Sequence, residues 1–204
     1  MNLEVVEQWV RWLGGAGVLV PLIAVFWGLW RGLHRPSGRT TGWAHKVLRA
    51  PFYLVATILY FGLCFLLWKP LPLNLSPPAR ITVLGLGALL YFPGLATLLW
   101  ARLTLGEMYN VSSGFGVQLY ADQRLVTHGP FALVRHPMYL GLMMAALGGV
   151  LIYRTWTLAF LAVNSLFLVI RARREEQALA AEFGAQWEAY CQRVPAWMPR
   201  FRRR

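Results

Sequence analysis

Five long apolar runs dominate this sequence and decide what it can fold into. Residues 13–30, 51–68 and 81–101 contain no charged side chain. Eighteen helical residues reach about 27 Å, close to the hydrocarbon thickness of a bilayer. Residues 138–153 and 155–170 are shorter and are separated only by Arg154, which favours a tight helical hairpin. We therefore predict an all-α integral membrane protein with five transmembrane helices, the last two forming that hairpin.

Composition supports this class and argues against a nucleic-acid-binding protein. The chain is 57% hydrophobic and 14% charged, a balance that a soluble domain of 204 residues cannot easily bury. Its net charge of +12 comes from basic residues that flank the apolar runs. Anionic lipid headgroups are the partner that such flanking charges predict.

The distribution of Lys and Arg predicts an orientation. With five spans, sixteen of these residues fall on the side of the C-terminus and four on the side of the N-terminus. The positive-inside rule then predicts an outside N-terminus and a cytoplasmic C-terminus. We expect one membrane domain over residues 1–204, with three spans in residues 1–101 and the last two spans and tail in residues 102–204.

A dense polar stretch, residues 125–141, precedes the fourth run. It holds two prolines, two glycines, two histidines and an arginine. Gly129-Pro130 predicts a turn, and Pro137 suits the first turn of a helix. Arg135 and His136 then lie at a helix N-terminus, where free N–H groups favour an anionic or hydroxyl-rich ligand. This predicts the reactive centre, against the alternative of a basic loop that only sets orientation.

The hairpin brings a second segment to this centre. Pro137 lies seventeen residues before Arg154 and Arg171 seventeen after it, so two antiparallel helices return to one depth. Arg171 and Glu175 share a helical face, whereas Glu176 points about 100° away. We therefore expect Glu175 to face the site, unless it only pairs with Arg171 on a solvated surface. Small residues spaced four apart in the fourth run, Gly141, Ala145 and Gly149, predict packing against the fifth.

Other segments give weaker signals. Residues 102–123 are loop-like and polar, and a wall of the site and a plain surface loop are equally compatible with them. No Cys and His spacing suggests a metal site, and Cys64 and Cys191 are expected too far apart to pair. The aromatic tail, residues 183–195, predicts a cytoplasmic C-terminal helix and a loop that folds back as a lid.

These motifs, taken in order, resemble a known family. Leu-Val-x-x-Gly-Pro-Phe, Arg-His-Pro-x-Tyr-x-Gly, Arg-x-x-x-Glu-Glu-x-x-Leu-x-x-x-Phe-Gly and Arg-Val-Pro occur within about the last eighty residues. The pattern is similar to that of the isoprenylcysteine carboxyl methyltransferases and related integral-membrane phospholipid methyltransferases. The resemblance implies a methyltransferase that uses S-adenosylmethionine in a pocket at the cytoplasmic ends of the last two spans.

The resemblance also assigns residues. It implies that Arg171 faces the acceptor, and that Glu175 binds the cofactor; these two are the expected catalytic residues. The adenine end would contact Gln123, Arg124, Leu125, Val126 and Phe131, and the ribose and methionine portions would contact His136, Pro137, Met138, Tyr139 and Glu175, with Gln118 as a further contact.

The acceptor is not determined by the sequence. Arg171 favours the carboxylate of an isoprenylcysteine-like, lipophilic acceptor, while amine and thiol acceptors stay open. A phospholipid amine N-methyltransferase is the nearest alternative. An NADPH-dependent membrane reductase and a non-catalytic lipid-binding protein are alternatives of other classes.

Overall fold

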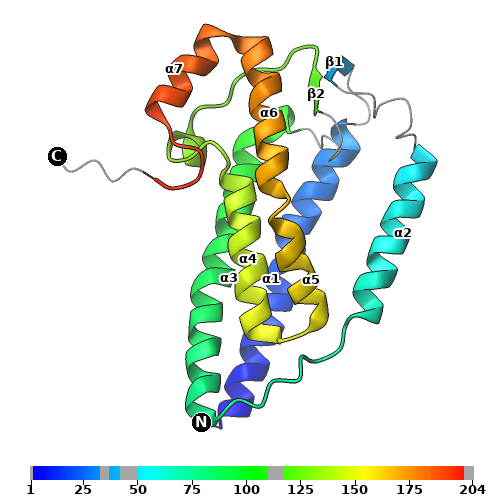
Figure 1. The fold of residues 1–204 in the computed structure, drawn as a ribbon, viewed down its shortest axis with the longest axis vertical. Coiled ribbons are helices and arrows are strands. Elements are labelled where there is room, and N and C mark those ends of the chain that lie inside the picture. The colour runs from blue at the N-terminus through cyan, green and yellow to red at the C-terminus, as the bar shows by residue number, and fades with distance from the viewer. Residues whose placement is uncertain (1, 33–36, 42–49, 110–116, 200–204) are drawn as a thin grey trace, which may run out of the picture.

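The structure is a computed structural model that describes residues 2–32, 37–41, 50–109 and 117–199, and helices make up most of it (Figure 1). By length and composition, three stretches can cross a membrane: most of α1 (Leu3–Gly32), α3 (Pro77–Leu105) with its extension to Met108, and the run Trp156–Phe183. α4 (Pro137–Tyr153) is a shorter apolar helix, and α2 (Ala50–Leu66) has seventeen residues. The chain is a mostly helical integral membrane protein.

The first and last spans differ from their predicted bounds. α1 begins at Leu3, ten residues before the first apolar run, because nothing in residues 3–12 stops a helix. The last predicted span is divided into α5 (Trp156–Ser165) and α6 (Leu168–Phe183). Leu166 and Phe167 between them keep right-handed helical angles, so the direction of the chain continues. The carboxylates of the site therefore lie on a helix that extends far beyond residue 170.

α3 and α4 pack closely through glycine. A Cβ atom on Gly148 would lie 2.5 Å from the backbone nitrogen of Tyr91, and one on Gly141 would lie 2.7 Å from the carbonyl oxygen of Gly94. The prediction that this stripe packs against the last span was therefore wrong for Gly141 and Ala145. It holds for Gly149, which faces Leu158 of α5. The reason is that α3 carries glycines of its own where α4 crosses it.

α1 lies against α3, and two polar contacts join them. Tyr91 donates its hydroxyl hydrogen to the carbonyl oxygen of Gly14 at 3.1 Å. Buried Arg102 donates from Nε to the carbonyl oxygen of Ala24 at 3.0 Å. α2 stands apart at the edge of the bundle (Figure 1), where Thr157 of α5 donates to its Cys64 carbonyl oxygen at 2.6 Å. The bonds of Tyr91 and Arg102 hold α1 against α3, and α4 packs on α3.

Two short strands correct the all-α prediction. β1 (Ser37–Thr41) and β2 (Val117–Tyr120) pair antiparallel, with Ser37 opposite Tyr120. Residues 117–120 alternate apolar and polar side chains and include Val and Tyr, which favour strands. The predicted loop over residues 102–123 is thus α3 to Leu105, a 3-10 turn η2 (Gly106–Met108) and β2, with residues 110–116 outside the described chain.

The loops divide between two ends of the bundle. Glu7, Arg80 and Arg154 meet at the end where the chain begins, with Glu7 within 3.0 Å of both arginines. Residues 135–136 meet Glu176 at the other end, beside α7 (Ala185–Arg193) (Figure 1). The connections following α2 and α4 therefore share one end with the N-terminus. Five spans that begin with an outside N-terminus require these two connections to lie at the N-terminal end of the bundle.

Candidate active site

The approach to α4 is shaped by the residues that the sequence analysis singled out. Gly129 adopts φ +60°, which glycine tolerates best, and begins a short 3-10 turn, η3 (Gly129–Ala132). Pro130 is fully buried, and Pro137 opens α4 with His136 as its N-cap residue. The turn and the helix start therefore lie where the prolines predicted them.

Glu176 of α6 binds the two polar residues before α4. Its Oε1 atom accepts a hydrogen bond from Arg135 Nε at 2.9 Å, lies 2.9 Å from the Arg135 terminal nitrogen, and lies 2.9 Å from His136 Nε2. The His136 side chain is 5% exposed and that of Glu176 is 25% exposed. Glu175 lines the cavity described below and Glu176 does not, but Glu176 is held against the residues before α4 and does not point into solvent. The α6 helix is rotated so that both consecutive carboxylates reach α4.

Glu175 makes a separate contact one turn into α4. Tyr139 donates its hydroxyl hydrogen to Glu175 Oε2 at 2.8 Å. The Arg171 guanidinium carbon lies 5.7 Å from the centre of the Tyr139 ring, in a cation–π arrangement. The Tyr139 ring also stacks on His136, with ring planes only 8° apart. Tyr139 thus connects the two carboxylate contacts.

α7 and the tail cover this end of the bundle. Arg135 and His136 donate their backbone N–H groups to the carbonyl oxygens of Pro195 and Ala196, at 2.9 and 3.2 Å. Tyr190 donates to the Phe131 carbonyl oxygen at 2.7 Å. Burial raises the pKa of Tyr190 to about 12, so its hydroxyl remains a donor at neutral pH. The tail is therefore bound along the approach to α4.

A cavity of about 90 Å³ lies between these elements. Seven of the expected site residues line it: Gln123, Arg124, Leu125, Val126, Phe131, His136 and Glu175. Pro137, Met138, Tyr139 and Arg171 do not line it, although Tyr139 bonds to Glu175 and Arg171 lies over the Tyr139 ring. The structure describes the backbone of Gln118 in β2 and not its side chain.

Sequence reasoning missed several of the residues that form the site. Leu105 lines the cavity from the end of α3, Met108 from η2, and Leu119 from β2. The Gln123 side chain donates to the Met108 carbonyl oxygen at 3.4 Å and accepts from the Tyr120 backbone at 3.3 Å. No motif marks Leu105 or Met108, because apolar residues at a helix end are common. Arg135 already belonged to the predicted reactive centre, and Glu176 carried a signal because it adjoins Glu175.

The region that builds this site matches a known family. The sequence profile of the family described as "Phospholipid methyltransferase" matches residues 81–186, just over half of the 204 residues. This chain belongs to the phospholipid methyltransferase family. The matched region runs from α3 through α6 into the start of α7 and includes both carboxylates and the approach to α4.

Relatives of this chain are named for different methyl acceptors. Protein-S-isoprenylcysteine O-methyltransferase of Schizosaccharomyces pombe is 39% identical over 80 residues, which cover 38% of this chain and 34% of that protein. Methanethiol S-methyltransferase 2 of Bradyrhizobium diazoefficiens is 28% identical over 154 residues, covering 72% of this chain and 58% of that protein. The chain thus matches about a third of the length of the yeast relative and just under three fifths of the bacterial one.

A solved structure is also similar to this phospholipid methyltransferase family member. The eukaryotic intramembrane Ras methyltransferase, isoprenylcysteine carboxyl methyltransferase, is 24% identical, with a TM-score of 0.47. The alignment covers 74% of this chain and 53% of that protein.

Proposed function

We propose that this protein is a membrane-embedded methyltransferase that transfers a methyl group from S-adenosylmethionine to a lipophilic acceptor. One observation carries the proposal. In a chain of the phospholipid methyltransferase family, Glu175 and Glu176 of α6 meet Tyr139 and His136 of α4 beside a cavity lined by seven expected cofactor residues. The named methyltransferase relatives support the same reaction class.

The residues present fit this cofactor by chemistry. Phe131 and the apolar side chains of Leu125 and Val126 suit an adenine ring, and the Glu175 carboxylate suits an ammonium group or ribose hydroxyls. The cavity of about 90 Å³ is smaller than the roughly 300 Å³ of a small ligand pocket. We therefore propose that Trp187 and Tyr190 of α7, which form one wall, move outward when the cofactor binds.

The cofactor, when bound, supplies an electrophilic methyl group that passes to the acceptor as the carbon–sulfur bond breaks. The protein's part is to align the two reactants and to exclude water. Tyr139 holds Glu175 in place through its hydroxyl group. Arg171, beside the Tyr139 ring, would orient an acceptor carboxylate without taking a proton from it. An anionic acceptor also gains from a site of low polarity, because its charge is cancelled during the transfer.

The carboxylate of an isoprenylcysteine-like acceptor is the substrate that we favour. Arg171 and the name of the yeast relative both support it. The description of the family keeps a phospholipid amine as the second candidate, and the bacterial relative adds a thiol. Methyl incorporation from labelled S-adenosylmethionine into farnesylcysteine, phosphatidylethanolamine and an alkanethiol separates the three. Binding of NADPH without binding of S-adenosylhomocysteine would instead favour a reductase.

We further propose five spans in one domain over residues 1–204, counting α2 and α4 with the three long stretches. The N-terminus would then lie outside, and the candidate active site would face the cytoplasm. The shared position of Glu7, Arg80 and Arg154 at one end supports this arrangement. Labelling of single cysteines introduced near residue 74 and near residue 186 of the full chain, in sealed vesicles, tests it.

Calorimetric titration of the purified protein with S-adenosylhomocysteine tests the cofactor site. We expect micromolar affinity in the wild type and no measurable binding in Glu175→Ala, because the variant loses the carboxylate. Glu188→Ala, on the exposed surface of α7, removes the same charge away from the cavity and is the matched control. Unchanged affinity in folded Glu175→Ala would refute the site assignment.

A further inference from the structure

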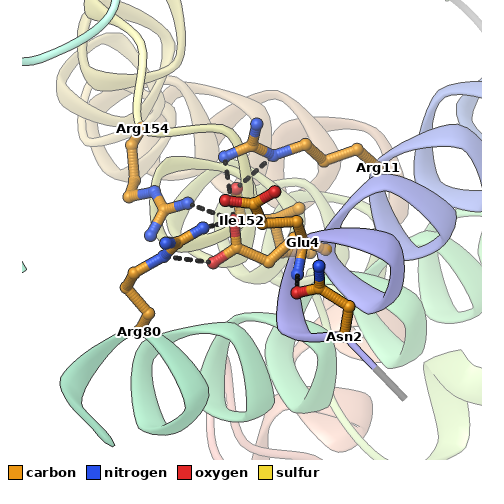
Figure 2. A network of polar contacts seen from close by, with 7 residues as sticks. Asn2, Glu4, Arg11, Arg80, Ile152 and Arg154 are labelled. Atoms are coloured by element: carbon orange, nitrogen blue, oxygen red, sulfur yellow. Dashed lines mark hydrogen bonds and ion pairs between the residues drawn. The ribbon is translucent and has the colours of Figure 1, made fainter. Parts of the chain in front are cut away.

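Three arginines converge on buried Glu7 at the end of the bundle where the chain begins. Figure 2 shows Arg11, Arg80 and Arg154 together, with Glu4 close by. Arg80 binds Glu7 with two hydrogen bonds of 3.1 and 2.8 Å, and Arg154 binds it at 3.0 Å. Arg11, one turn along α1, lies 3.9 Å from the same carboxylate and donates from Nε to the Ile152 carbonyl oxygen at 3.2 Å. These contacts hold α1, α3 and the end of α4 together.

The cluster carries more positive charge than its carboxylate can balance. Glu7 offsets one of the three guanidinium charges, and its side chain is 5% exposed. Glu4 is a second acidic residue near Arg80, so three positive charges face two negative ones. The arginine side chains are 39%, 30% and 15% exposed for Arg11, Arg80 and Arg154. Each guanidinium has five N–H donors. Within the described chain, the contacts above engage only one or two nitrogen atoms of each, so donors remain available.

These arginines face a cavity of about 640 Å³. Its other polar lining residues are Asn74, Ser76 and Tyr153, and the described residues that line it include no carboxylate. Glu7 and Glu4 line a neighbouring cavity. The inner surface of the first cavity is therefore cationic and rich in hydrogen-bond donors.

The backbone adds to the same potential. α3 begins beside Ser76, which lines the cavity; its first two residues are prolines without N–H groups, so its N-terminus contributes through the helix dipole. The first N–H groups of α5 are bonded to Lys69, Leu67 and Thr155 and add no donors. Helix N-termini carry partial positive charge and attract anions. The Ser76 hydroxyl makes no capping bond to its own helix, which leaves it able to contact a ligand. The arginine charges, their remaining donors and the dipole of α3 all favour a multivalent anion.

The surroundings of the cluster are typical of a membrane interface. Trp12 and Trp68 line the neighbouring cavity and are 70% and 55% exposed. Tryptophan is enriched where the hydrocarbon meets the headgroups. An anion that approaches this cavity would therefore come from water or from a lipid headgroup.

We propose that this cavity binds a phosphate group, carried by an anionic phospholipid or free in solution. Arginine forms paired hydrogen bonds with phosphate oxygens. The phosphate would offset the positive charge that Glu7 and Glu4 leave unbalanced and would brace α1, α3 and the α4–α5 turn. This site is independent of the methyl-transfer function proposed above.

The test uses the full chain, purified in detergent and stripped of lipid. Phosphatidylglycerol, or phosphatidylcholine with the same acyl chains, is titrated while native mass spectrometry counts the bound lipid. In a second arm, the thermal midpoint is measured in potassium phosphate and in potassium chloride of equal ionic strength. Arg11→Gln removes a cavity charge and leaves the Glu7 contacts of Arg80 and Arg154 intact. Arg11→Lys restores that charge, and Lys69→Gln removes an exposed charge near the same end.

We expect one phosphatidylglycerol to bind in preference to phosphatidylcholine, or phosphate alone to raise the midpoint. Arg11→Gln should weaken the effect about ten-fold, the loss expected for one charge-assisted hydrogen bond. Arg11→Lys should recover most of it, and Lys69→Gln should match the wild type. The first arm identifies a headgroup as the source, and the second identifies free phosphate. Equal binding of both lipids with no effect of phosphate, or equal losses in Arg11→Gln and Lys69→Gln, would show that the arginines only join helices.

Discussion

Glu176 gives the sharpest test of how α6 is held against α4. Its carboxylate binds Arg135 and His136, whose side chains are 15% and 5% exposed. Glu176→Ala leaves both without this partner. Breaking a buried ion pair costs about 3–5 kcal/mol, and the 25% exposure of Glu176 reduces this, because water can replace part of the contact. We expect a loss of about 2–3 kcal/mol.

For a chain of this size, each kcal/mol lowers the thermal midpoint by roughly 2–4 °C. Glu176→Ala should therefore lower the midpoint by roughly 4–12 °C, measured by thermal unfolding in detergent. The matched control is Gln177→Ala, which removes an exposed polar side chain from the next position on α6 and should change the midpoint by about 1 °C or less. If both variants shift the midpoint equally, the contacts of Glu176 do not stabilise the fold, and the reasoning fails.

Two further predictions test the packing and the tail. Gly148→Val should prevent α4 from approaching α3, because its Cβ would lie 2.5 Å from a backbone nitrogen, and should sharply reduce the folded yield; Gly62→Val, with open space around it, should not. Size-exclusion chromatography measures both yields. Burial raises the pKa of the Cys191 thiol, so in a background without the other cysteine its alkylation should be slower than that of a free cysteine at pH 8 and should still accelerate above pH 9. A rate that levels off below pH 8 would contradict this.

Several features of the site could be predicted because they are local. Gly129, Pro130 and Pro137 restrict their own backbone angles, so the turn and the start of α4 follow from residue type. Because residues 137 and 171 are equally far from Arg154 in the sequence, we expected the start of α4 to lie beside α6, and the contacts of Glu175 and Glu176 lie there. Short-range geometry was sufficient for these predictions.

Other features depended on neighbours that no pattern in the sequence identifies. The rotation of α6 decides that Glu176 reaches His136, and a wheel drawn for one isolated helix cannot supply that rotation. Gly141 packs on α3 because α3 places Gly94 opposite it. The pairing of β1 with β2 joins segments about eighty residues apart.

The sequence alone determined that this chain enters a membrane, where α4 begins, and which stretch gathers the polar chemistry, because hydropathy, proline and glycine act on the backbone where they occur. Only the tertiary structure decided which carboxylate contacts which partner, which helix covers the glycines of α4, and that Arg11, Arg80 and Arg154 converge on Glu7. Those outcomes depend on how helices rotate and pack against one another, and that is a property of the whole bundle.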